Sequence, residues 1–225
     1  MTHTIIKNSR IGVRVDSAAD LTIKNSKIYN TASSGLLGVH STVNAENCLF
    51  YNNSGNNVQI EFGGNYTFNY CTMASYGSRE AAIAMNNIRC YERSGINCIR
   101  AKTYPLSIRL TNSIFYGSKD DEISLYDATK TGANDFDVLF KNCIVRVKDL
   151  LKTENYPNFL TQNCQNCQNA AATVRLFKKI SEQNFKLDSL SVADGKAIVL
   201  PNITTDIENK IRSVSTPDIG CYEKE

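Results

Sequence analysis

Hydrophobic and polar residues alternate in a short phrase that recurs along the chain. Its copies are GVRVD at 12–16, LLGVH at 36–40, NVQIE at 57–61, AIAMN at 82–86 and EISLY at 122–126. Alternation with a period of two is typical of a strand with one buried face and one exposed face. We expect each copy to form a strand whose apolar residues face a core and whose intervening residues face outward.

A second phrase alternates with the first. Its copies are LTIKNSKIYN at 21–30, VNAENCLFYN at 43–52, YTFNYCTMAS at 66–75, SIRLTNSIFY at 107–116 and VLFKNCIVRV at 138–147. Asparagine precedes a serine or cysteine in every copy but the third, where a tyrosine replaces it. We expect one further strand per copy, with the small residue inside the core: Ser26, Cys48, Cys71, Ser113 and Cys143.

Two short strands per repeat, a period of roughly 20 to 30 residues and polar corners predict an all-β fold. The pattern favours a single-stranded right-handed parallel β-helix, a solenoid of the pectate-lyase-like type, with about five to six coils. A β-propeller needs four strands in each blade, and a leucine-rich repeat needs a helical segment after an LxxLxL strand. Neither pattern occurs in this chain.

The repeats divide the chain into two predicted parts. Residues 1–150 are expected to form the coils, with an insertion at 87–105 that leaves the solenoid as a loop. Residues 151–225 are expected to form an irregular segment and a C-terminal cap that covers an open coil, where unpaired backbone and apolar interior would otherwise be exposed. Because TIIKNSRI resembles LTIKNSKI, we expect the chain to begin inside the solenoid.

The last 50 residues carry a family resemblance. They read RLFKKISEQNFKLDSLSVADG, followed by TTDIENKIR and PDIGCYE at 217–223. This text is similar to the C-terminal region of bacterial right-handed β-helix proteins of the choice-of-anchor Q type. The matching positions are Leu176, Phe177, Phe185, Leu187, Ser189 or Ser191, Gly195, Asp206, Arg212 and the closing 217–223.

The resemblance implies an exported protein, periplasmic or at the cell surface, of a kind associated with glycan use or adhesion. It departs from the family pattern at SVADG, at Glu208 and Asn209, and at Cys221. Phe185, Ile219 and Tyr222 are the residues expected to cover the open coil. Fold alone does not determine activity, so function has to be sought in particular residues.

Composition and charge narrow the range of partners. The 25 basic and 22 acidic residues leave a net charge of only +3, and no basic stretch is interleaved with aromatic residues, so nucleic acid is not expected as a partner. No apolar run is long enough to span a membrane. No nucleotide-binding, zinc-protease or nucleophile-elbow motif occurs, so we expect no cofactor.

The eight cysteines suggest a metal or disulfides before their positions are considered. Cys164 and Cys167 have the spacing of half a zinc site, but a second such pair is missing, so no metal is expected. In an exported protein, Cys90 with Cys98 and Cys164 with Cys167 could form exposed disulfides.

Outward-facing residues of the first phrase form columns, because equivalent residues on successive coils lie about 4.8 Å apart. One predicted column reads Arg14, Gly38, Gln59, Ala84 and Ser124, and the next reads Asp16, His40, Glu61, Asn86 and Tyr126. Asp16, His40 and Glu61 are candidate acid and base groups of a polysaccharide hydrolase or lyase. Two coils would separate the carboxylates by about 9 to 10 Å, which disfavours a retaining hydrolase.

The same columns support a binding function without catalysis. Polar and aromatic side chains along the coils could hold a polysaccharide or surface glycan, with the insertion as one wall. The candidate binding residues are Arg14, Gln59, Asn86, Tyr126, Tyr91, Arg93 and Arg100. The first hypothesis is thus a glycan-binding or surface-contact module, the second a polysaccharide-degrading enzyme, and the third a structural spacer whose outer face is merely solvated.

Overall fold

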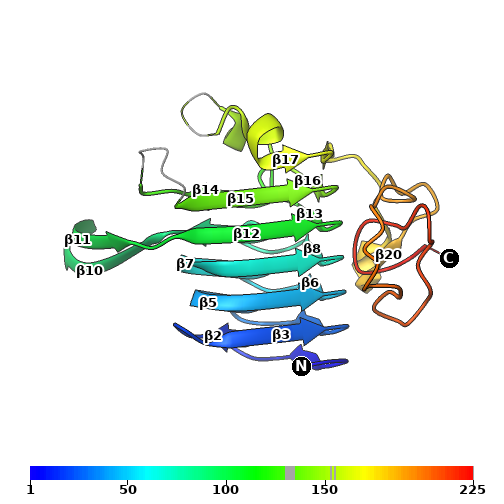
Figure 1. Ribbon diagram of the computed structural model, residues 1–225, viewed down its shortest axis with the longest axis horizontal. Helices are drawn as coiled ribbons and strands as arrows, with labels where there is room; N and C mark the ends of the chain where they lie inside the picture. The colour runs from blue at the N-terminus through cyan, green and yellow to red at the C-terminus, as the bar shows by residue number, and fades with distance from the viewer. Residues whose placement is uncertain (130–134, 153, 155, 225) are drawn as a thin grey trace.

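The structure is a computed structural model that describes residues 1–129, 135–152, 154 and 156–224. Its strands stack into two long parallel sheets along one solenoid axis (Figure 1). In Figure 1 the strands of the front sheet run from left to right while the chain rises from its N-terminus, so the coils are right-handed. The predicted fold class, a right-handed parallel β-helix, is confirmed.

One sheet, sheet A, contains the first phrase and the first half of the second. Every strand pair within it is parallel. Its strands are β2 (Val13–Val15), β3 (Asp20–Lys24), β5 (Leu36–Glu46), β7 (Val58–Asn69), β9 (Ile83–Asn86), β12 (Leu106–Thr111), β14 (Ile123–Tyr126), β15 (Phe136–Lys141) and β17 (Cys164–Gln165).

The other sheet, sheet B, contains the second half of the second phrase, so a complete coil has three strand segments instead of the two expected. Within β5 and β7 the first two segments run together as one bent strand. The strands of sheet B are β1 (Ile5–Lys7), β4 (Lys27–Tyr29), β6 (Leu49–Tyr51), β8 (Thr72–Ser75), β13 (Ile114–Gly117), β16 (Ile144–Val145) and β18 (Gln168–Asn169).

The corner between the two sheets explains why the second phrase splits. The residue before each serine or cysteine is left-handed, with φ between 48° and 55°, a conformation that asparagine tolerates better than most residues. These corner residues are Asn25, Asn47, Tyr70, Asn112, Asn142 and Asn166. The five predicted small residues that follow are each 0% exposed, which confirms their place in the core.

The interior of the solenoid is closed at its upper end by residues that follow β16. A 3₁₀ turn, η1 (Asp149–Leu151), and a π-helical turn, η2 (Phe159–Asn163), place Leu150 and Phe159 over the last coils. The Phe159 ring meets the Phe140 ring edge-on at 5.4 Å. Strand pairing continues beyond residue 150, because β17 and β18 add to both sheets.

The C-terminal segment, residues 171–224, runs along the flank of the solenoid, and we call it the strap (Figure 1). It contains β19 (Phe177–Lys179), a 3₁₀ turn η3 (Ile180–Glu182) and β20 (Asn184–Leu187). Sequence analysis expected Phe185, Ile219 and Tyr222 to cover an open coil end. They pack on the outer face of sheet B instead, because that face is itself apolar through Leu49, Tyr51, Ala74, Ile114, Tyr116 and Ile144.

Arg212 attaches the strap to the corner column. Its guanidinium lies 3.8 Å from the centre of the Tyr70 ring and donates hydrogen bonds to Asn47 Oδ1 at 2.8 Å and to the Gly220 carbonyl at 3.0 Å. It also forms an ion pair with Glu223 at 3.2 Å, and only 3% of Arg212 is exposed. Tyr70 breaks the asparagine pattern and supplies the aromatic face for this contact.

We expect Arg212→Ala to lower the free energy of unfolding by about 3 kcal/mol, because it leaves the buried Glu223 carboxylate without its cation and Asn47 Oδ1 without its donor. Chemical denaturation measured by circular dichroism tests this expectation. The matched control is Lys24→Ala, which removes a partly exposed ion pair with Glu46 and should cost less than about 1 kcal/mol. Equal losses for the two variants would contradict the role of Arg212.

Glu122 is a buried carboxylate directly before β14. It is 0% exposed and accepts hydrogen bonds from the Ser75 hydroxyl, the Ala82 N–H at 3.0 Å and the Lys119 N–H at 2.8 Å. Burial raises the pKa of Glu122 above its ordinary value, although these donors act in the opposite direction. The folded state therefore binds this proton more tightly than the unfolded chain does.

A raised pKa contributes stability that is present below the unfolded pKa and is lost as the pH rises through the folded value. We expect the difference in unfolding free energy between wild type and Glu122→Gln to shift in favour of the wild type as the pH falls from about 8 to about 4. Paired denaturation curves across this range measure the shift. A difference that is constant with pH, or that moves the other way, would contradict it.

Candidate ligand-binding hollow

Strand register corrects the predicted outward columns at one coil. Leu37 pairs with both Arg14 and Gln59, and Val39 pairs with Glu61. Val39, and not His40, thus stands in the column of Asp16 and Glu61. The predicted alignment of β5 is therefore wrong by one residue, because Leu37 and Val39 occupy the column positions expected for Gly38 and His40.

The pattern of β5 made this error possible, because its first residues are apolar on both faces. Leu36 is the inward residue, at 0% exposure, yet the outward Leu37 is only 7% exposed. Gly38 also faces inward, where a Cβ would lie 2.6 Å from the Tyr66 ring. The missing side chain makes room for that ring, and only the folded packing reveals it.

The three candidate catalytic residues do not converge on one point. Asp16 is exposed and forms an ion pair with Arg14 at 2.8 Å. His40 lies at the bend of β5, where its Nδ1 is 3.1 Å from the Phe62 carbonyl oxygen. Glu61 accepts a hydrogen bond from Gln59 Nε2 at 2.7 Å.

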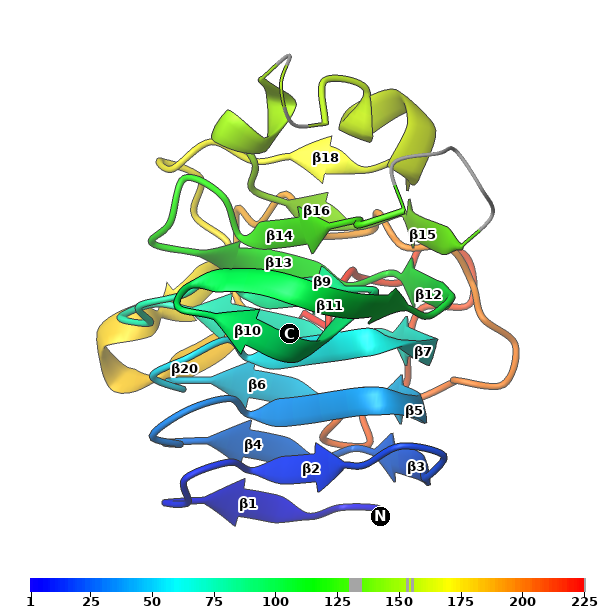
Figure 2. The same cartoon turned by 90° about the vertical axis from the view of Figure 1, so that its left-hand side faces the viewer.

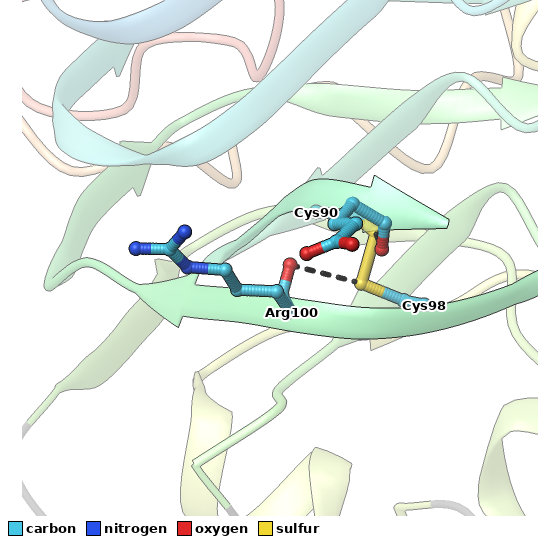
Figure 3. The surroundings of a disulfide bond; sticks show 4 residues. Cys90, Cys98 and Arg100 are labelled. Carbon is cyan, nitrogen blue, oxygen red and sulfur yellow. Dashed lines mark hydrogen bonds between the residues drawn. A yellow bond between two sulfur atoms is a disulfide. The ribbon is translucent and has the colours of Figure 1, made fainter. Parts of the chain in front are cut away.

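The insertion forms an antiparallel hairpin of β10 (Ile88–Ser94) and β11 (Asn97–Thr103). Figure 2 shows it in front of β9, projecting from the side of the solenoid. A disulfide joins Cys90 to Cys98 across the two strands, and this is one of the two cysteine pairs that sequence analysis considered (Figure 3). An isolated two-stranded hairpin is marginal in water, so this bond braces it.

Aromatic and cationic side chains hold the base of the hairpin against sheet A. The Tyr104 ring packs on the His40 ring with 4.6 Å between their centres. The Arg89 guanidinium lies 5.3 Å from the centre of the Phe62 ring, and the Tyr104 N–H donates to the Asn87 carbonyl at 2.8 Å. His40, proposed from the sequence as a catalytic group, is thus a contact of the hairpin base.

A hollow of about 440 Å³ lies between the hairpin and the outer face of sheet A. The structure brings four sequence-predicted residues to it, namely Glu61, Asn86, Arg93 and Tyr126. It also adds residues that sequence analysis missed, because their place depends on how the hairpin folds back. These are Phe62, Ile88 and the disulfide-bonded Cys90 and Cys98.

The polar groups of the hollow are available to a ligand. Asn86 Oδ1 accepts the Phe62 N–H at 3.2 Å and the Ile88 N–H at 3.3 Å, so among the described residues its NH₂ group keeps its donors unused. Within the same part of the chain, Arg93 has no ion-pair partner. Tyr126 is 59% exposed and lines the hollow.

Four predicted binding residues lie outside this lining. Arg14 is engaged with Asp16, and Gln59 joins Ser34 to Glu61. Tyr91 shares a hydrogen bond with the Tyr104 hydroxyl. The Arg100 side chain extends away from the disulfide in Figure 3.

Cys164 and Cys167 carry free thiols, so the second predicted disulfide is absent. The physical reason is that Cys167 follows the left-handed Asn166 and occupies the small-residue position of a further corner, which turns it toward the core. In the described part of the chain, no group of three or more His, Cys, Asp or Glu residues could hold a metal ion.

No family model and no curated protein matches the sequence. Among solved structures, the crystal structure of pectate lyase Pel9A is similar, with 12% identity and a TM-score of 0.47 over 100% of this chain. The chain spans 66% of that lyase. No helix in the described residues has the length and apolar character needed to cross a membrane.

We expect peptide mapping without reductant to recover Cys90 linked to Cys98, while Cys164 and Cys167 are alkylated as free thiols after denaturation. The expectation follows from the hairpin, which places the first pair on facing strands. The Cys90→Ser variant, in which Cys98 becomes alkylatable, is the control for the assignment. A peptide that links Cys164 to Cys167 would contradict the structure.

Proposed function

We propose that this chain is an exported β-helix module that binds a carbohydrate in the hollow between sheet A and the hairpin. The observation that carries the proposal is the joint presence of an exposed aromatic ring, Tyr126, and an amide with unused donors, Asn86, in one concave site. Sugars present hydroxyl groups at their edges and C–H groups on their faces. An aromatic ring beside hydrogen-bonding groups matches both features.

The remaining lining residues support the same ligand class. The hollow falls within the size range of small-ligand sites. Glu61 offers a carboxylate oxygen to a hydroxyl group, and Arg93 offers donors from the opposite wall. The disulfide restrains that wall, which reduces the ordering required on binding.

Two observations support export. The Cys90–Cys98 disulfide is the kind of exposed bond that persists in oxidising compartments. The C-terminal resemblance to choice-of-anchor Q proteins points the same way, and its Arg212 and 217–223 residues have a structural role in holding the strap. A periplasmic or cell-surface location is thus part of the proposal.

Polysaccharide cleavage is the alternative function, and the experiment below distinguishes it from binding. Among the described residues that line the hollow, Glu61 is the only carboxylate. Glycoside hydrolysis commonly uses a pair of carboxylates, and Asp16 stands two coils away in an ion pair with Arg14. The geometry therefore favours binding.

Glycan-array screening followed by calorimetry on the best ligand tests the proposal. We expect Tyr126→Ala to weaken binding by about tenfold or more, because it removes the stacking surface, and Asn86→Ala to weaken it by roughly fivefold. Tyr126→Phe should retain most of the affinity, since the ring remains. Ser124→Ala, on the same strand but outside the hollow, is the matched control.

Binding that is indifferent to both Tyr126→Ala and Asn86→Ala would reject this site. The same ligand should be incubated with wild type and Glu61→Gln, and its reducing ends and unsaturated products measured. Release of product by wild type but not by Glu61→Gln would replace the binding proposal with an enzymatic one.

A further inference from the structure

The tip of the β10–β11 hairpin exposes two aliphatic side chains far from the core. Ile96 is 93% exposed and Ile99 is 60% exposed. In Figure 1 the hairpin extends away from the coils on the side opposite the strap. These isoleucines therefore stand at a projecting end of the molecule.

The fold does not require an isoleucine at this turn. Ser94 pairs with Asn97, which leaves Gly95 and Ile96 as the two turn residues. Gly95 supplies the positive φ of 60° that the turn needs. The following position in such turns is usually polar. A branched apolar residue there exposes apolar surface to water, which is unfavourable, and the turn does not need it.

Positive charge is concentrated on the same hairpin. Between Ile88 and Thr103 the chain carries four cationic residues and one acidic residue, a net charge of 4 − 1 = +3, which equals the formal net charge of the whole protein. Outside the hairpin the charges therefore sum to zero. Among the described residues none of the four cations forms an ion pair with an acidic side chain: Arg89, Arg93, Arg100 and Lys102.

We propose that the hairpin tip binds the surface of an anionic lipid membrane. Ile96 and Ile99 enter the boundary between headgroups and acyl chains, while Arg100 remains at the level of the lipid phosphates. A bilayer offers negative charge directly above an apolar layer, which matches a cationic hairpin with an apolar end. In this arrangement the hairpin is a peripheral contact with the membrane surface.

Other occupants match only half of this surface. A second copy of the hairpin would bring +3 against +3, which like-charge repulsion opposes. An acidic polysaccharide would satisfy the cations but would leave the isoleucines without an apolar partner. Ile96, Ile99, Arg100 and Lys102 lie outside the lining of the hollow, so this surface is distinct from the proposed glycan site.

Vesicle sedimentation with the intact, disulfide-bonded protein tests the proposal. We expect binding to mixed phosphatidylcholine and phosphatidylglycerol vesicles, little binding to phosphatidylcholine alone, and weaker binding as salt is added. Ile96→Asp should reduce partitioning by more than about tenfold, because a carboxylate replaces an inserted apolar group. Arg100→Gln should reduce it by about fivefold.

Two variants control for exposed apolar area and for charge elsewhere. Val214→Asp changes a side chain on the strap that is 87% exposed, and Lys196→Gln removes an exposed strap cation. Both should bind vesicles like the wild type. Glycan binding in the hollow should survive Ile96→Asp, which separates the two sites.

Absence of binding to the mixed vesicles would overturn the proposal, as would an unchanged affinity in Ile96→Asp. Polygalacturonate is the probe for the competing occupant. If the protein binds polygalacturonate through Arg100 but ignores vesicles, the hairpin recognises an acidic polysaccharide and the lipid proposal is wrong.

Discussion

The in-register stacking of one coil on the next is the constraint on which the rest of this structure depends. Parallel strands share their backbone hydrogen bonds only if every coil turns at the same place, and the left-handed corner residues provide that turn. Asparagine suits the corner because its short side chain tolerates the conformation, and the Asn47 amide also donates to Asn25 on the coil below. The buried serine or cysteine that follows keeps the interior narrow.

The strap depends on this stacking and also protects it. Sheet B carries apolar residues on its outer as well as its inner face, so the solenoid alone would leave a broad apolar flank in water. The strap covers that flank and bonds to the corner column through Asn47, Tyr70, Asn112 and Asn142. The corners therefore set the coil geometry and also provide the attachment points for the C-terminal segment.

The hairpin has the opposite character, because it leaves the stack and contributes little to the core. It is held by contacts at its base and by one disulfide, and every residue of β11 is exposed. Loops positioned by a rigid scaffold commonly carry function in this way. Here the regular coils supply one wall of a hollow, the hairpin supplies the other, and its charge distinguishes it from the remainder of the molecule.

The sequence by itself determined the coils, since strand alternation and the asparagine corner are local properties that repeat visibly. It also determined the buried small residues, placed Glu61, Asn86 and Tyr126 on an outward surface, and placed Arg93 in the insertion beside it. Only the tertiary structure decided the register of β5, because Leu36 and Leu37 are both apolar and the role of Gly38 depends on the distant Tyr66 ring. It likewise decided the course of the strap and the closure of the hollow by the hairpin, since both depend on contacts between residues far apart in the chain.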